Sequence, residues 1–462
     1  MSTAALSPGK QKSLKDPELK ETLQRLRLTD NLTNFYYLLR TYLYFALVIG
    51  GTIWFFYSRE AWGLPYWLNI PITIFAIILI GAGQHQLSGL AHEAVHHILF
   101  RNRYLNDLMS EWFCMFPLFS STHHYRLQHL AHHQFVNDPV RDPDISQLQT
   151  SGHWLPFPME KKAFLLTLLK QLWLPNLFRF IRIRAAYNAT GTDKNPYMRK
   201  GWKPSKLAIR AAILYMVVLI ATLTGLVILG NPLWLAMVPA VLYVSLVVFY
   251  LLLPESKFHQ SRIHSVLSQR TGTILRVSFI TLVFNCLAWL SLLVDPWAPF
   301  YYFLLWLVPI FTSFSFYMIL RQLVQHGNAD RGWLTNTRTF FVSHFINFSV
   351  FPIGQEYHLP HHLYATVPHF RLKQLHTALL EYPEYLEQAV QVHGYFVSPE
   401  KPQIHPTVLD VLGPEYAPRE FHGVHIDDTV LEDVDVEEKA EILREGVAEV
   451  QRLTTEAAAK KA

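Results

Sequence analysis

Histidine, the side chain that most often binds metal ions, is concentrated in three short stretches of this sequence. They are HEAVHH (92–97), HHYRLQHLAHH (123–133) and HLPHH (358–362). In the first stretch His92 and His96 are four residues apart, so a helix would place both rings on one face. A single histidine usually has a surface or capping role. The repeated spacing instead predicts that these residues bind metal.

The second and third stretches repeat this geometry. The histidines are His129, His132 and His133 in one, and His358, His361 and His362 in the other. Proline is tolerated in the first turn of a helix, so Pro360 leads us to expect His358 just outside a helix that carries His361 and His362. With one nitrogen from each ring, the eight histidines at these spacings are too many for one metal ion and enough for two.

The residues alone do not identify the metal. Imidazole suits iron, zinc and copper alike. HEAVH also matches H-E-x-x-H, the zinc-protease motif, in which the glutamate acts as a general base. That alternative leaves the second and third histidine stretches without a role, and Asp330 is followed by Arg331 rather than by glycine. A zinc protease in the membrane and a non-catalytic metal-binding membrane protein are therefore distant alternatives.

The segments between the histidines are those of a membrane protein. Of the 462 residues 51% are hydrophobic and 16% are charged, a balance typical of several membrane-spanning helices. A span needs about 20 apolar residues, and six runs are long enough. They cover residues 36–57, 71–91, 208–229, 233–253, 274–294 and 299–320, so we expect about 4–6 spans.

Charge predicts which side the histidines face. Residues 134–206 contain twelve Lys or Arg, whereas the three short connections near 59–69, 230–232 and 295–299 contain one, Arg59. Excess Lys and Arg mark the cytoplasmic side. An even number of spans separates the long segments, so all histidine stretches should lie on the cytoplasmic side of a multi-pass integral membrane protein.

Composition also divides the chain. We expect an N-terminal arm and interfacial helix over 1–35, a membrane domain with a cytosolic cap over 36–394, and a polar, acidic, helical tail over 395–462. The formal charge of +5 comes without a basic, aromatic-lined stripe, so nucleic acid is not an expected partner.

Three motifs in this order resemble the histidine boxes of the membrane fatty acid desaturase and hydroxylase superfamily. The family pattern is HxxxH, HxxHH and HxxHH, which here reads H92-EAV-H96, H129-LA-H132-H133 and H358-LP-H361-H362. The contexts HHQFVNDPVRDPD and HHLYATVPHF are also similar to those of desaturase-like enzymes. The resemblance covers about residues 40–376.

This resemblance implies an all-α fold: a multi-pass helical membrane domain whose cytosolic helical cap holds a histidine-rich di-metal site. It implies two non-haem iron ions and O2 as co-substrate. The activity would be desaturation of a lipid acyl chain, or alternatively hydroxylation or ketolation of a lipid or carotenoid. The implied ligands are His92, His96, His129, His132, His133, His326, His358, His361 and His362; His326 is included because it follows the last apolar run.

Electrons must come from a partner. The sequence shows no dinucleotide fingerprint, no haem-binding HPGG segment and only two cysteines. We therefore expect an external donor, a ferredoxin, rubredoxin or cytochrome b5-type carrier. The basic segment 161–206 would suit an acidic carrier, and anchoring to anionic lipid headgroups explains that segment equally well.

Several residues near the histidine boxes have more than one possible role. His97 would be a tenth ligand or would support another ring, whereas His123, His124, His344 and His369 are expected to be structural. Asn137, Asp138, Asp142 and Asp144 would orient rings, bind a headgroup, or simply cap a proline-rich turn. Trp112, Phe113 and Tyr125 are candidates for a substrate tunnel.

Overall fold

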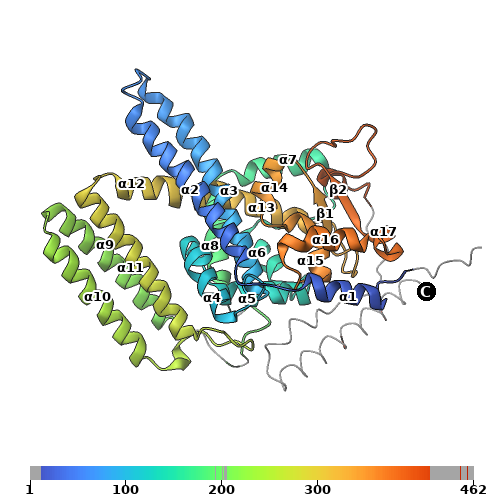
Figure 1. The fold of residues 1–462 in the computed structure, drawn as a ribbon, viewed down its shortest axis with the longest axis horizontal. Coiled ribbons are helices and arrows are strands. Elements are labelled where there is room, and N and C mark those ends of the chain that lie inside the picture. Colours follow the sequence, from blue (N-terminus) through green and yellow to red (C-terminus); the bar gives the residue numbers. More distant parts are fainter. Residues whose placement is uncertain are drawn as a thin grey trace, which may run out of the picture.

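The structure is a computed structural model that describes residues 12–192, 194–199, 201, 205–416, 448 and 455. It is mostly helical, as predicted (Figure 1). The C-terminal end of the expected acidic tail lies outside the described residues, apart from 448 and 455. Residues 395–416, assigned to the tail from the sequence, include Val408 and Val411, which are buried in the main hydrophobic core.

Among the residues that the structure describes, six helices are long and apolar enough to cross a membrane, which agrees with the predicted spans. They are α2 (Thr33–Ser58), η1 (Tyr66–Leu68) with α3 (Asn69–Val95), α9 (Leu207–Leu229), α10 (Pro232–Leu252), α11 (Gln269–Leu293), and a last span, Ala298–Gln325, built from α12 (Ala298–Tyr302), η5 (Phe303–Leu307), η6 (Ile310–Phe314) and α13 (Ser315–Gln325). Figure 1 shows α9, α10 and α11 as a group beside the body, with the α2–α3 hairpin protruding from it.

Local sequence explains where the spans turn. Gly230 ends α9 in the left-handed conformation that glycine adopts without strain, and Pro232 opens α10. Asn231 caps α10 by accepting a hydrogen bond from the backbone nitrogen of Trp234 at 3.2 Å. The short GNP connection is therefore a tight helical turn, as the sequence predicts.

The last span is irregular where it approaches α3. Its segments η5 and η6 are π-helical turns, a distortion found often near functional sites. A Cβ atom on Gly81 of α3 would lie 2.6 Å from the backbone nitrogen of Phe314, so a larger residue would force the two helices apart. Glycine here lets the span that leads to His326 pack closely against α3.

The remaining helices form a body at the ends of the spans (Figure 1). They are α1 (Pro17–Leu26), α4 (Arg103–Ser110), η2 (Glu111–Met115), η3 (Phe116–Leu118), α5 (Thr122–Gln134), α6 (Pro143–Ser151), α7 (Lys161–Gln171), α8 (Leu174–Asn188), η4 (Glu255–Lys257), α14 (His344–Val350), η7 (Gln355–Tyr357), α15 (His358–Leu363), α16 (His369–Leu379), α17 (Pro383–Gln388) and α18 (Val408–Val411). Leu19 and Leu23 of α1, expected at the membrane surface, are instead buried in one cluster with Leu372 and Leu375 of α16.

Two short strands, which the sequence analysis did not predict, connect distant parts of the body. Strand β1 (Arg338–Phe341) pairs in parallel with β2 (Val390–His393), so that Arg338 lies opposite Val390. Thr337, immediately before β1, donates its hydroxyl proton to the carbonyl of Gln325 at 2.7 Å. The strand pair thus fixes the segment that follows the last span.

Candidate metal centre

Three helices and the end of a fourth bring the predicted ligand residues together. Helix α3 carries His92 and ends beside His96, α5 carries the second box, α15 carries the third, and His326 directly follows α13. Helix α15 begins at His358, so this residue is the first of the helix rather than just outside it; Pro360 fits because it lies in the first turn. Eight of the nine rings are buried and His326 is half-buried.

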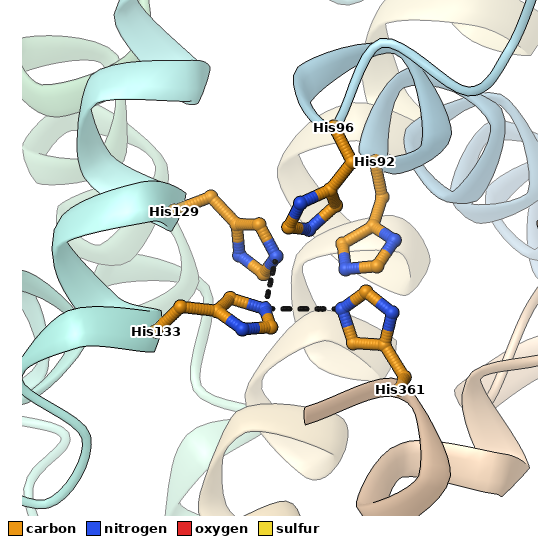
Figure 2. Close-up of side chains that lie close together, drawn as sticks. All are labelled: His92, His96, His129, His133 and His361. Carbon is orange, nitrogen blue, oxygen red and sulfur yellow. Dashed lines mark hydrogen bonds between the residues drawn. The ribbon is translucent and has the colours of Figure 1, made fainter. Parts of the chain in front are cut away.

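The nine imidazoles form two groups. In the first group one nitrogen of each ring lies within 4.8 Å of the others; its members are His92, His96, His129, His133 and His361 (Figure 2). The Nε2 atom of His133 is 3.0 Å from the Nε2 atoms of both His129 and His361. The buried Nε2 atoms of His92 and His96 have no hydrogen-bond partner among the described residues. Five nitrogens from three helices thus surround one small volume.

The second group has four members, within the same 4.8 Å limit: His132, His326, His358 and His362. The Nε2 atom of His326 lies 3.1 Å from that of His132 and 3.0 Å from that of His358. His133 of the first group stacks on His362 of the second, with ring centroids 4.2 Å apart. The two groups are therefore neighbours, as the two halves of a dinuclear site would be.

Hydrogen bonds on the outer side of two rings show that this donor set fits metal ions. The Nδ1–H of His326 donates to the carbonyl of Asn336 at 2.9 Å, and that of His132 donates to the carboxylate of Asp142 at 3.0 Å. The Nε2 atom of neutral His326 therefore carries a lone pair, which faces Nε2 of His132. Imidazole nitrogen is a suitable donor for a metal ion at this place.

Burial keeps most of these rings ready to bind metal. It lowers the pKa of His129, His133 and His362 well below the usual value, and the charges of neighbouring imidazoles lower it further. Burial also lowers the pKa of His361 to about 3. Neutral imidazole is the form that binds metal, so these rings need not lose a proton first.

His132 differs because it faces an acid. Burial lowers its pKa, but the negative charges of Asp142 and Asp144 outweigh that effect and raise it to about 9. Both oxygens of Asp142 lie 3.0 Å from Nδ1 of His132, which fixes the ring orientation. Asp142 also accepts from the backbone nitrogen of Asp144 and so caps α6. Asp142 therefore has two of the roles considered for this turn, since it orients a ring and caps a helix.

Arg126 holds the first two boxes in register. This residue of α5 is fully buried, and its Nε and Nη2 donate to the carbonyls of Val95 and Ala94 at 3.1 and 2.8 Å. Those carbonyls end α3, where the helix leaves carbonyl groups unpaired. The arginine therefore ties the helix of the second box to the end of the helix that carries the first.

A cavity opens onto both groups of histidines. Its lining includes His92 and His129 of the first group and His132, His326 and His358 of the second. Arg184 lines this cavity and also a second, apolar cavity of about 460 Å³ formed with Phe178, Phe311 and other apolar side chains. Arg184 thus lies between the cavity at the histidines and a predominantly apolar one.

The other predicted histidines lie outside the two groups. His97 lies beside Arg126, its Nδ1 3.4 Å from Nη2. His123 contacts Ser261 at 3.0 Å, His124 packs on His259, and His344 is exposed. The backbone N–H of His369 donates to the carboxylate of Glu93 at 2.7 Å. Glu93 therefore serves to anchor α16, a role unlike that of a protease base.

Of the three aromatic residues proposed to line a substrate tunnel, one lies at the metal centre. Tyr125 lines the metal-facing cavity. Trp112 packs on Phe279, and Phe113 is exposed, so neither lines that cavity. Asn137 donates to the carbonyl of Asn336 at 2.9 Å, which helps to place the segment after His326.

Sequence reasoning missed the arginines of the cavity, Arg184 and Arg321, because neither belongs to a motif. A charged residue near the end of an otherwise apolar span was the available signal for Arg321. A third cluster, formed by His393, Glu400 and His405, was also not predicted. Its two rings stack 3.9 Å apart at 12°, and both Nδ1 atoms contact Oε1 of Glu400 at 2.8 Å.

Comparison with known proteins agrees with this geometry. A family model described as fatty acid desaturase matches residues 65–256 and 249–394. A dihydrorhizobitoxine desaturase of Bradyrhizobium elkanii is 30% identical over 148 residues, which are 32% of this chain and 38% of that protein. A Delta(5) fatty acid desaturase, fat-4, of Caenorhabditis elegans is 31% identical over 125 residues, which are 27% of this chain and 25% of that protein. The matched part spans less than two thirds of each relative.

Proposed function

Because the chain belongs to the fatty acid desaturase family, we propose that it introduces a C=C bond into an aliphatic acyl chain, using O2 and a pair of non-haem iron ions. The observation that carries this proposal is the convergence of nine imidazoles in two adjoining groups beside a cavity. The first group would hold one ion and the second group the other. The zinc-protease alternative uses only His92 and His96 of these nine residues.

The bound irons would supply, with O2 and two electrons, the oxidising power for R–CH2–CH2–R′ + O2 + 2 e⁻ + 2 H⁺ → R–CH=CH–R′ + 2 H2O. The protein supplies geometry and a dry site. Asp142 orients His132, and Arg126 holds α5 to the end of α3. The apolar cavity beside Arg184 would bind the chain and exclude water from the centre.

An external carrier of the ferredoxin, rubredoxin or cytochrome b5 type would provide the electrons. The histidine groups would face the cytoplasm, where such a carrier is available. Exposed cations on α7 and α8, such as Lys162 and Arg182, support a docking surface for an acidic carrier or for anionic lipid.

Lipid profiling of a host that expresses the chain tests the activity directly. The wild type should produce a lipid with one more double bond, and a His132→Ala variant at equal abundance should not. A product that gains a hydroxyl or keto group instead would assign the alternative reaction on the same scaffold. No new product under reducing conditions with a supplied carrier would contradict the proposal.

A further inference from the structure

Two buried arginines face the candidate metal centre. Arg184 on α8 and Arg321 on α13 both line the metal-facing cavity, and each is only 5% exposed. They share that wall with His92, His132 and His358. Arginine is rarely this buried unless it is paired, because an uncompensated charge in a protein interior is strongly unfavourable.

In the part of the chain that the structure describes, no ion pair involves Arg184 or Arg321. Arg321 donates from Nη1 to Oε1 of Gln355 at 2.7 Å, and its buried Nε has no hydrogen-bond partner among the described residues. Both arginines also face Tyr125, and the Cζ of Arg184 lies 5.8 Å from the centroid of that ring. Both therefore have unused donors beside the cavity.

The acids in the same wall are already engaged. Asp142 accepts from His132, and Oδ1 of Asp144 accepts from Nε2 of Gln128 at 2.6 Å. Burial lowers the pKa of Arg184 to about 10, the charge of Arg321 adds to this lowering, and Asp144 partly opposes it. Arg184 thus stays charged at neutral pH, and an anion bound in the cavity would pair with it.

We propose that Arg184 and Arg321 bind a carboxylate of the substrate, and that the substrate is therefore a carboxylic acid that reacts close to its acid group. The inference rests on the proposed function. Guanidinium groups bind carboxylates with paired, charge-assisted hydrogen bonds, which give both affinity and orientation. A carboxylate held there would place the adjoining carbons beside the histidine groups that line the same cavity.

Two kinds of carboxylic acid could bind these arginines in the same way, a free fatty acid and a short, water-soluble acid. Arg184 also lines the apolar cavity of about 460 Å³, which would accept the chain of a free fatty acid. A short, water-soluble carboxylic acid would use the metal-facing cavity alone. Octanoate and butanoate distinguish these sources, and 1-octanol, which has the chain without the charge, is the control ligand.

The test measures binding by calorimetry to the full-length, metal-containing protein, without O2 or reductant so that no turnover occurs. Octanoate should bind at least about tenfold more tightly than 1-octanol, and Arg184→Gln should remove that difference while leaving octanol binding unchanged. Arg179→Gln, an exposed change on the same helix that lines neither cavity, should leave the affinity for octanoate and for octanol unchanged. Butanoate binding as tight as that of octanoate would identify a short acid, and weaker binding a fatty acid.

Equal affinity for octanoate and octanol, or unchanged octanoate binding in Arg184→Gln, would overturn the proposal. If that variant does not fold, Arg321→Gln and Arg184→Lys replace it; the former should weaken octanoate binding about tenfold, and the latter should retain part of it. Octanoate affinity equal to that of the wild type in both variants would also overturn it.

Metal content and product formation, measured on the same samples, separate this inference from the proposed function. Arginine-dependent octanoate binding without double-bond formation in any supplied acid would contradict the function and leave the carboxylate site. Double-bond formation without a preference for acid over alcohol would contradict the carboxylate site and leave the function.

Discussion

Arg126 and Asp107 form an ion pair that is sealed inside the protein between the first two histidine boxes. The Nη2 and Nη1 atoms of Arg126 donate to the two oxygens of Asp107 at 2.6 and 2.9 Å, and the arginine is fully buried. The same guanidinium also binds the carbonyls that end α3. The pair therefore couples the folding of α4 and α5 to the position of the ligand helix.

Removing the acid of this pair should destabilise the protein strongly. Asp107→Asn leaves Arg126 buried without a counter-charge, and we expect a loss of about 3–5 kcal/mol in the free energy of unfolding. Denaturant titration of the purified protein in detergent measures it. Glu18→Gln, which breaks the exposed Lys12–Glu18 contact, is the control and should change little. A loss in Asp107→Asn no larger than in the control would show that α4 and α5 do not depend on the pair.

Asp142 should matter for metal retention more than for folding. Asp142→Asn keeps the shape but weakens the hydrogen bond that orients His132, so metal affinity should fall about 10–100-fold. Competition with a chelator of known affinity measures this change. Asp138→Asn, in the same turn but paired with Arg141, should keep metal affinity close to that of the wild type. Equal affinities in all three proteins would contradict a role for Asp142 in orienting the ring.

Buried histidines outside the metal centre should make stability fall in acid. Burial lowers the pKa of His124 well below the usual value, and lowers that of His123 to about 3 and that of His259 to about 4; nearby Arg276 further lowers that of His124. The unfolded chain takes up protons below about pH 6.5 and the folded chain does not, so the free energy of unfolding decreases as pH falls from about 6.5 to about 4.

A substitution tests this assignment. His124→Gln should reduce the slope of stability against pH in that window by up to about 1.4 kcal/mol per pH unit. Denaturant titrations at several pH values measure the slope, and His344→Gln, at an exposed position, should leave it unchanged. Parallel curves for the wild type and His124→Gln would exclude this histidine as a source of the acid sensitivity.

Cysteine labelling tests the side on which the histidine groups lie. In a background where Cys114 and Cys286 are replaced by alanine, a cysteine at Lys162 should react with an impermeant reagent only from the cytoplasm. A cysteine at Glu60, between the first two spans, should react only from the opposite side. Both positions are exposed. Labelling of the two from the same side would contradict the topology proposed from the positive charges.

The spans and the three histidine boxes could be predicted from the sequence because both depend on local patterns. Apolar length determines a span, and i, i+4 spacing places His92 and His96 on one face. His326 could be chosen only through the family resemblance, since its neighbour His358 comes from a distant helix.

The division of the nine rings into sets of five and four could not be predicted. It depends on how α3, α5 and α15 cross, which places His133 near His361 but His132 near His326. Helices α5 and α15 each contribute to both sets. The β1–β2 pair and the cavity arginines were also beyond prediction, because they arise from contacts between residues far apart in sequence.

We propose that each of these two sets holds one iron ion. Anomalous diffraction data at the iron edge, from crystals of the purified protein, would locate the ions. We expect two peaks, one among His92, His96, His129, His133 and His361 and one among His132, His326, His358 and His362, and we expect the first peak to be lost in His133→Ala. A single peak, peaks at the zinc edge alone, or no metal between these rings would contradict it.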